Sequence, residues 1–278
     1  LAQKLSDEAP TATVGLVSIA DHVNGGRQRL FHFKEAAQQY QASPLVIYAD
    51  DSLNPAVTEE LSRCDRFVVT GRVSPWWMDY LNSQGKPLVL LGESPDGREY
   101  PVPRVRFDWA GAFCLGLDAM RRRGRQKIGG IFFPPEYYTA TTRIMRAFDA
   151  ELKAAGIAVD PSRIYRMPAD GKSLDSLGRF LVANRDQMDA VFIDSSCLEF
   201  FWYYRSQVGL PPDLEVVVFG EEQNTPYSYA EFPHHHQLYF PESPMAASVK
   251  VLFDWSGRFL EECRSYLLQP TLLESHTA

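Results

Sequence analysis

Polar side chains recur directly after the apolar segments of this sequence, where they could meet a ligand. Those suited to a hydroxyl-rich molecule are Asp21, His22, Arg72, Glu93, Asp108, Tyr137, Asp194, Ser195, Glu221 and Gln223. Carboxylates and amides pair with adjacent hydroxyls, and an aromatic ring covers the C–H face of a sugar. The set therefore favours a site for a small polyhydroxylated molecule. For each residue taken singly, an exposed position in a loop is the alternative.

The common sequence motifs of catalysis and metal binding do not occur in this chain. There is no Gly-x-Ser-x-Gly elbow, no Walker loop and no Gly-x-Gly-x-x-Gly after the first predicted strand. His234, His235 and His236 are consecutive, so their side chains cannot all converge on one ion. We therefore predict no catalytic residue, no metal, no cofactor and no enzymatic activity. An α/β enzyme is the alternative, and it would need a positioned nucleophile or acid–base pair.

Alternating strand and helix patterns must position the polar residues. Buried strands are predicted at 13–19, 44–48, 66–70, 87–91, 128–133, 162–165, 190–193 and 214–219. Helices are predicted between them at 30–40, 55–63, 75–84, 141–155, 173–184 and 197–208. This order predicts right-handed βαβ units and parallel sheets, and 278 residues suffice for two lobes. Because ligands bind beyond the carboxyl ends of parallel strands, the polar residues would line a cleft between the lobes.

One stretch, 105–133, combines a strand end, a helix, a tight turn and a strand. The apolar residues of the helix recur at helical spacing, at Ala112, Leu115, Ala119 and Met120. Three arginines, 121–123, suit the negative end of the helix, and Gly124 suits a left-handed cap.

This stretch resembles the LacI/GalR family of transcription regulators. The family has Asp-Asn, Gly-Ala and Gly-His-Arg-Arg-Ile where this chain has Asp108, Gly111-Ala112 and 124–128. Further similar segments follow in register, at 13–17, 87–92, 188–192, 209–219 and 269–275. The resemblance implies an α/β fold like that of type I periplasmic binding proteins, with two doubly wound parallel-sheet lobes joined by three crossovers. It implies a hinge-helix remnant and linker at 1–9, an N-terminal lobe at 10–125 plus 238–268, and a C-terminal lobe at 126–237 plus 269–278.

The resemblance also implies a function. The chain would be the effector-binding and dimerisation body of a repressor-like regulator, lacking its helix-turn-helix head. A sugar or sugar derivative in the inter-lobe cleft would control operator binding, with Asp108 among its contacts. The family's arginine at the start of the second-lobe helix has no exact counterpart, and Arg143, which lies one residue off, is the candidate for its role. Leu5 falls where the family's hinge helix enters the minor groove, and Trp76 and Trp77, both expected to be exposed, would join a homodimer face. The family's Asn-Asp pair is replaced by Ser195-Ser196 and its sugar-binding Asp by Gly220, which argues against a standard hexose.

Composition and charge agree with a globular chain. The net charge is −7, and the run from Arg121 to Lys127 is the one basic cluster, so the body itself is not a DNA-binding surface. The four cysteines, Cys64, Cys114, Cys197 and Cys263, match no metal or redox spacing. With no signal peptide at the start, we expect reduced thiols and a cytoplasmic location. The alternative, a periplasmic-type solute-binding protein, predicts an upstream signal peptide and a monomer.

Overall fold

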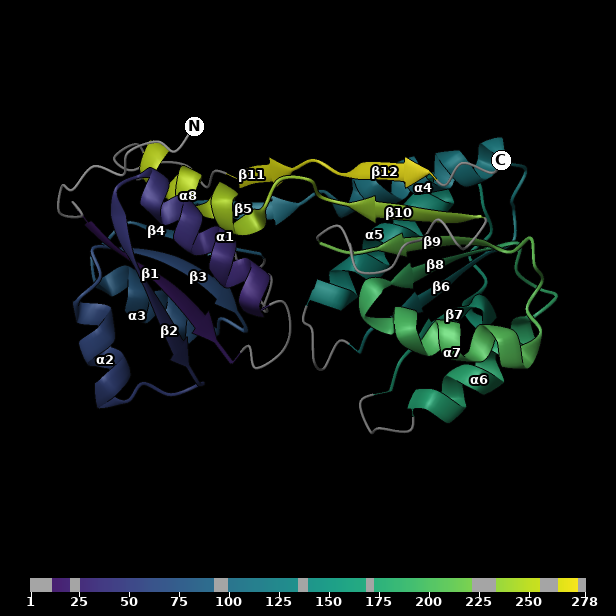
Figure 1. The fold of residues 1–278 in the computed structure, drawn as a ribbon, viewed down its shortest axis with the longest axis horizontal. Coiled ribbons are helices and arrows are strands. Elements are labelled where there is room, and N and C mark those ends of the chain that lie inside the picture. Colours follow the sequence, from purple (N-terminus) through teal and green to yellow (C-terminus); the bar gives the residue numbers. More distant parts are fainter. Residues whose placement is uncertain are drawn as a thin grey trace, which may run out of the picture. The chain divides into compact units, whose positions relative to one another are not determined.

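The computed structural model of the chain describes residues 12–20, 26–92, 100–134, 140–168, 173–221, 234–255 and 265–274. The chain divides into two compact units (Figure 1). Unit 1 comprises Leu1–Arg106 and Glu242–Leu268, and unit 2 comprises Phe107–Pro241 and Gln269–Ala278. The chain therefore passes from one unit to the other three times.

Unit 1 is built on a six-stranded sheet with the strand order β11-β5-β4-β3-β1-β2. Its strands are β1 (Ala12–Ile19), β2 (Ala42–Ala49), β3 (Arg66–Gly71), β4 (Leu88–Leu91), β5 (Arg104–Phe107) and β11 (Ser265–Leu268). Strands β1 to β5 pair in parallel. The central strands are buried on both faces, which explains their uninterrupted apolar runs in the sequence.

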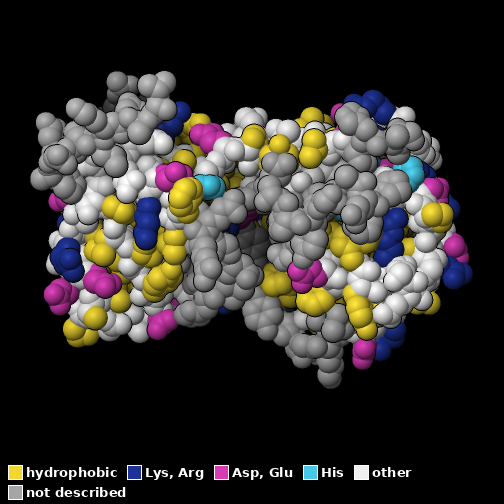
Figure 2. Space-filling model, in the orientation of Figure 1, with side chains coloured by type: hydrophobic (Ala, Val, Ile, Leu, Met, Phe, Trp, Pro, Cys, Tyr) yellow, Lys and Arg dark blue, Asp and Glu magenta, His cyan; other side chains and the backbone are white. Residues whose placement is uncertain are grey.

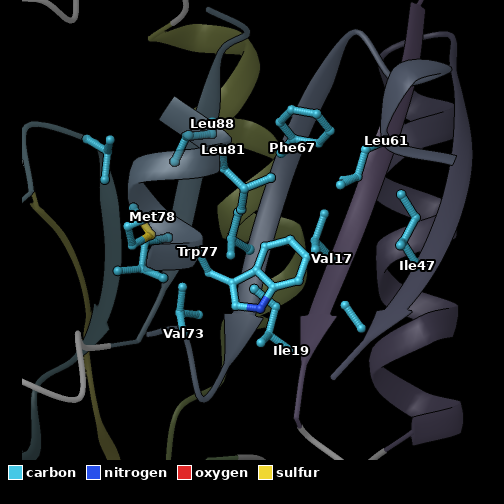
Figure 3. Packing of buried hydrophobic residues seen from close by; sticks show 14 of the residues in the cluster. Val17, Ile19, Ile47, Leu61, Phe67, Val73, Trp77, Met78, Leu81 and Leu88 are labelled. Atoms are coloured by element: carbon cyan, nitrogen blue, oxygen red, sulfur yellow. The ribbon is translucent and has the colours of Figure 1, made fainter. Parts of the chain in front are cut away.

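Helices α1 (Gly26–Gln39) and α8 (Pro244–Asp254) pack against each other in unit 1. Helices α2 (Pro55–Ser62) and α3 (Pro75–Ser83) add their apolar residues to a core with β1, β2 and β3 (Figure 3). Both α2 and α3 begin with a proline at the first helical position, after Asn54 and Ser74 respectively. The side chains of these two residues accept hydrogen bonds from the first turn, which is the usual way to satisfy free helix N–H groups.

The two adjacent tryptophans of α3 have different environments. Trp77 is fully buried in the core of unit 1, and its indole nitrogen donates to the carbonyl of Asp50 at 3.0 Å (Figure 3). The expectation that Trp77 is exposed is therefore wrong, because that side of α3 faces the sheet. Trp76 is 48% exposed and stacks on Tyr80.

Unit 2 repeats the architecture with the strand order β12-β10-β9-β8-β6-β7. Its strands are β6 (Ile128–Phe132), β7 (Ile164–Arg166), β8 (Ala190–Asp194), β9 (Glu215–Phe219), β10 (His235–Tyr239) and β12 (Thr271–Glu274). The pairs from β7 to β10 are parallel, and β12 closes the edge as an antiparallel strand on β10.

Helices cover both faces of the unit 2 sheet. On one face lie α4 (Trp109–Arg122) and α5 (Ala140–Ala154), with Phe113 and Phe148 against Phe192 of β8. On the other lie α6 (Ser173–Asn184) and α7 (Leu198–Val208), which share a core with alternate residues of β6, β8 and β9. Gly124 follows α4 with a φ of 77°, as the predicted left-handed cap requires.

The expected α/β class and doubly wound parallel sheets are confirmed, but several details differ. The first passage between units lies at Arg106–Phe107 and not at residue 125, so α4 belongs to unit 2, where it packs on α5 and β12. The second lies at Pro241–Glu242, because His235–Tyr239 is a strand inside unit 2. Residues 161–163 form a short 3-10 helix before β7, where the sequence predicts strand from 162.

Acidic and basic side chains are interspersed on the face of each unit shown in Figure 2. Among the described helices, none combines the length and the apolar character that crossing a membrane requires.

Candidate functional site

The carboxyl edge of the unit 2 sheet brings together acidic residues from two neighbouring strands. Asp194 is the last residue of β8 and pairs in register with Phe219, the last residue of β9. Glu221 follows β9 by two residues and is close enough to raise the pKa of Asp194 through its negative charge. Two predicted ligand residues that are distant in sequence therefore lie at one sheet edge.

Asp194 is a buried carboxyl group with an unusual protonation equilibrium. The residue is only 7% exposed, and its side chain accepts a hydrogen bond from the backbone N–H of Ser196 at 2.9 Å. Burial raises the pKa of Asp194 to about 6, although hydrogen bonds from Ser196 and from the backbone of Phe133 act in the opposite direction. Near neutral pH this group can therefore either accept or donate a hydrogen bond, which suits a ligand hydroxyl.

Asp108 occupies the beginning of α4, and its carboxylate caps that helix. The backbone N–H of Gly111 donates to Asp108 Oδ1 at 2.9 Å. A side chain at residue 111 would collide with Asp108 Oδ2, so the glycine leaves room for the cap. Capping accounts for Asp108 without a ligand, yet the residue remains half-exposed.

The position of α4 also brings Asp108 to the carboxyl edge of the unit 2 sheet. The next residue, Trp109, is buried with its ring edge-on to Phe219, the end of β9, and to Phe240. Asp108 thus starts its helix at the same end of the sheet as Asp194.

Helix α5 supplies the basic candidate, Arg143, from its first turn. The residue is half-buried and engaged in an interaction of its own. Thr141, two residues earlier in the chain, is not among the predicted site residues. It is fully buried, and its hydroxyl has no hydrogen-bond partner within the described structure. A buried, unsatisfied hydroxyl at a helix start is a polar group that a ligand could satisfy. Its only sequence signal is its place two residues before Arg143.

The remaining predicted residues fall into two groups. Ser195 is half-buried beside Asp194, and Arg72 of unit 1 is an exposed residue after β3, where its backbone N–H donates to the carbonyl of Ile19 at 2.7 Å. The others lie outside the described residues, namely Leu5, Asp21, His22, Glu93, Tyr137 and Gln223.

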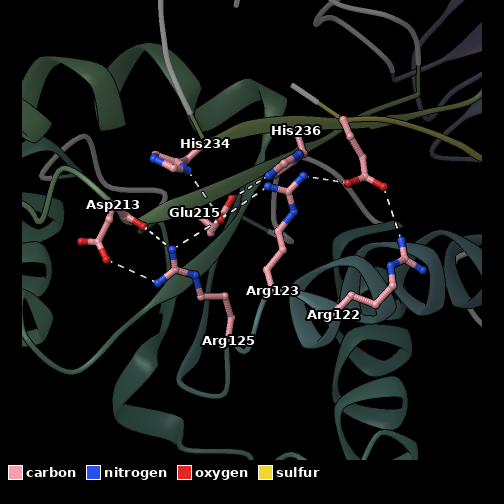
Figure 4. A network of polar contacts seen from close by, with 8 residues as sticks. Arg122, Arg123, Arg125, Asp213, Glu215, His234 and His236 are labelled. Atoms are coloured by element: carbon pink, nitrogen blue, oxygen red, sulfur yellow. Dashed lines mark hydrogen bonds and ion pairs between the residues drawn. The ribbon is translucent and has the colours of Figure 1, made fainter. Parts of the chain in front are cut away.

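The histidine run at the start of β10 directs its side chains to opposite faces of the sheet. His235 stacks on Trp202 of α7, while His234 and His236 lie beside Glu215 on the other face (Figure 4). No cluster of His, Cys, Asp or Glu that could hold a metal ion occurs among the residues whose structure is described.

Glu215 begins β9, at the amino edge of the sheet, and is surrounded by positive charge (Figure 4). Its carboxylate lies 2.7 Å from His236 Nε2, 3.4 Å from Arg125 and 3.8 Å from Arg123. Burial alone would raise the pKa of Glu215, but the His236 hydrogen bond and these charges outweigh it and hold the pKa below its ordinary value. The negative and positive groups of this network compensate one another, and they lie at the opposite end of the sheet from the candidate site.

The ion pairs continue from Glu215 to the edge strand. Arg123 also bonds Glu274 of β12 at 2.8 Å, and Arg122 approaches the same carboxylate at 3.4 Å. The Arg123 hydrogen bond is the main reason that the pKa of Glu274 is low. Strand β12 is thereby tied to α4 as well as to β10.

No protein-family model matches the sequence, and no curated protein matches it either. Among solved structures, the chain is similar to a LacI-family regulatory protein from Chloroflexus aggregans, with 16% identity, a TM-score of 0.73, and coverage of 95% of this chain and 97% of that chain. The lac repressor dimer bound to operator and an anti-inducer is 15% identical with a TM-score of 0.73, over 97% of this chain and 94% of that chain. A LacI-family regulator from Enterococcus faecium with bound ribose is 17% identical with a TM-score of 0.70, over 94% and 97%.

The chain has the fold of the LacI-family regulators. The family resemblance found in the sequence is thus confirmed at the level of the fold, across nearly the whole chain. These LacI-type neighbours are transcription regulators and not enzymes.

Proposed function

We propose that the chain is the effector-binding and dimerisation body of a LacI-type DNA-binding transcription regulator. The observation that carries the proposal is the likeness to LacI-family regulators over almost their full length and almost the full length of this chain. The strands of the two units follow the same order across their sheets, so the same architecture occurs twice. Such a body would bind a small molecule and change how an attached DNA-binding head meets its operator.

The proposed effector is a small polar molecule, a sugar or sugar derivative. Two similar regulators are described with cellobiose and with ribose. Asp194 and Glu221 would accept hydrogen bonds from its hydroxyls, and Arg143 and Thr141 would add polar contacts from α5. The expectation of a cleft that also includes Arg72 and the loops after the strands of unit 1 stays a prediction.

Operator binding, dimerisation and a cytoplasmic location belong to the same proposal. One similar structure is a dimer bound to operator. Trp76, half-exposed and stacked on Tyr80, is the aromatic residue of α3 that a homodimer contact would use. Leu5 would act in the hinge helix that meets DNA.

A calorimetric titration tests the effector proposal. The 278-residue chain is titrated with monosaccharides, disaccharides, polyols and phosphorylated sugars. A true effector at 100 times its Kd raises the free energy of unfolding by about 2.7 kcal/mol, which a thermal-shift screen detects first. We expect Glu221→Gln to weaken binding at least tenfold, while Glu199→Gln, an exposed residue on α7, leaves the Kd unchanged.

Three results would contradict the proposal. If no hydroxylated compound binds, or if Glu221→Gln and Glu199→Gln bind equally well, the unit 2 edge is not the effector site. If the chain is a monomer that binds sugar and its gene encodes an export signal, the solute-binding alternative replaces the regulator.

A further inference from the structure

Strand β10 carries histidines into both faces of the unit 2 sheet. His235 is 2% exposed, and its ring stacks on the indole of Trp202 with a centroid distance of 5.5 Å and an interplanar angle of 20°. Adjacent His236 points to the opposite face, where it is fully buried against Glu215. Two adjacent residues of one strand therefore bury their imidazole rings on opposite faces of the sheet.

Among the residues that the structure describes, the charges that act on the pKa of His235 are positive. From α7, the Arg205 guanidinium lies over the Trp202 ring at 4.9 Å, and from β10 itself His236 adds positive charge when protonated. From β9, the register partner of His235 is Val216, which is apolar, while the Glu215 carboxylate lies on the other face with His236 and His234. Glu199, the acidic residue in the first turn of α7, is exposed. A second positive charge at His235 is therefore unfavourable in the closed structure.

The titration of His235 agrees with this geometry. Burial, with His236 and Arg205 acting in the same direction, lowers the pKa of His235 from the ordinary 6.5 to about 3. The imidazole is thus neutral in the folded strand and would become charged near pH 6.5 once exposed. A depressed pKa of this kind contributes stability above pH 6.5, and that stability is lost as pH falls toward 3.

The surroundings of β10 also favour local opening over unfolding of the whole unit. Its outer neighbour, β12, is an edge strand of four residues that are half-buried or exposed, joined to β10 by four residue pairs and to the end of α4 by the ion pairs of Glu274. His234, at the start of β10, has a φ of 65°, a left-handed conformation that residues other than glycine seldom adopt. Strand β10 is as buried as most of the sheet but adjoins this edge strand, whereas β8 lies between β6 and β9 with no edge strand beside it.

We propose that β10 is an acid-sensitive element: protonation of His235 requires the strand to separate from α7, so the β10–β12 edge of unit 2 opens below neutral pH before the rest of the unit. The consequence is a C-terminal strand whose attachment to unit 2 depends on pH. This device is independent of the effector site, which lies at the other end of the sheet.

Hydrogen exchange of the whole chain tests the proposal. Protection factors, which correct for the pH dependence of intrinsic exchange, are measured at pH 7.5 and pH 5.5. One proton taken up at an ordinary pKa of 6.5 raises the opening constant about tenfold between these values. We expect that change at the amides of β10 and β12, and none at those of β8 or of β1 in unit 1.

Matched variants identify the residue responsible. In His235→Gln the tenfold change disappears, because the amide does not titrate, whereas in His32→Gln of unit 1 it persists. The proposal is overturned if protection at β10 and β12 does not depend on pH, if β8 changes equally, or if His235→Gln keeps the wild-type pH dependence.

A second measurement covers the case in which His235→Gln does not fold. NMR titration of the wild-type chain with labelled histidine follows each Cε1–H resonance. We expect at least one histidine to remain neutral at pH 5.5. If every histidine titrates with a midpoint above pH 5.5, His235 is not held neutral and the proposal is wrong.

Discussion

The two ends of the unit 2 sheet each bury a carboxylate, and the two carboxylates behave in opposite ways. Asp194 ends β8 at the carboxyl edge, and burial raises its pKa to about 6. Glu215 begins the adjacent strand β9 at the amino edge, and its pKa is lowered despite burial. The difference lies in the partners: Glu215 has His236 and two arginines, while Asp194 has hydrogen bonds and a second carboxylate nearby.

This contrast distinguishes an amino edge that stabilises the fold from a carboxyl edge that could bind a ligand. At the amino edge, the described partners of Glu215 are the positively charged Arg123 and Arg125 and the imidazole of His236, so the network stabilises the fold. At the carboxyl edge, Asp194 lies near a second carboxylate and its pKa is raised, which is typical of functional sites.

The largest expected effect comes from removing the balanced carboxylate. Glu215→Gln leaves Arg123, Arg125 and His236 around a neutral amide, and breaking a buried ion pair in this way destabilises proteins by about 3–5 kcal/mol. Urea unfolding measures the loss, with Glu59→Gln, an exposed glutamate of α2, as control. A loss below about 1 kcal/mol would mean that the network contributes little to stability.

Removing the carboxylate of Asp194 should instead raise the free energy of unfolding. The pKa of Asp194 is 3.8 in the unfolded chain and about 6 in the folded one, so ionisation opposes folding as pH rises through 6. At about 1.4 kcal/mol for each pH unit between these values, Asp194→Asn should stabilise the chain by up to about 3 kcal/mol at pH 7.5. Below pH 3.8 the variant and the wild type should be equally stable. Destabilisation by Asp194→Asn at pH 7.5 would show that its charge is compensated after all.

The helix cap at the carboxyl edge predicts a smaller loss. Gly111→Ala places a Cβ against the Asp108 carboxylate and displaces it from the first turn of α4. Loss of such a cap costs about 1–2 kcal/mol. Thermal unfolding measures it, and Ala110→Gly, on the exposed side of the same turn, controls for helix propensity. Glycine is less favourable than alanine inside a helix by about 0.5–1 kcal/mol, so without capping Gly111→Ala would stabilise the chain by about as much as Ala110→Gly destabilises it. Stabilisation of that size by Gly111→Ala would therefore contradict the capping role.

The smallest effect is expected at the outer end of the amino-edge network. Glu274 is 37% exposed, so its pairs with Arg122 and Arg123 are screened by solvent, and Glu274→Gln should destabilise by about 0.5–1 kcal/mol. The pKa of Glu274 is lowered from 4.5, so this contribution is present above pH 4.5 and is lost as pH falls below it. Unfolding curves at pH 7 and pH 3.5 measure it. An equal difference between variant and wild type at both pH values would rule out the ion pairs as its source.

The sequence by itself determined the architecture. The sequence predicts eight of the strands, most of them from apolar runs, because a strand buried on both faces must be largely apolar. It also predicted the polar residues after those strands. It did not predict β10, whose residues His235 to Gln237 are polar, nor α8, which is apolar on nearly all sides because it packs between α1 and the sheet.

Only the tertiary structure decided which carboxylates are balanced. Asp194 and Glu215 are the same kind of group in the sequence, and their pKa values diverge through neighbours that strand register and helix packing bring from distant positions. The same reason applies to Trp77, to the passages between the units and to the two faces of the histidine run. Local patterns report the period of an element, whereas burial and charge depend on what the rest of the chain places beside it.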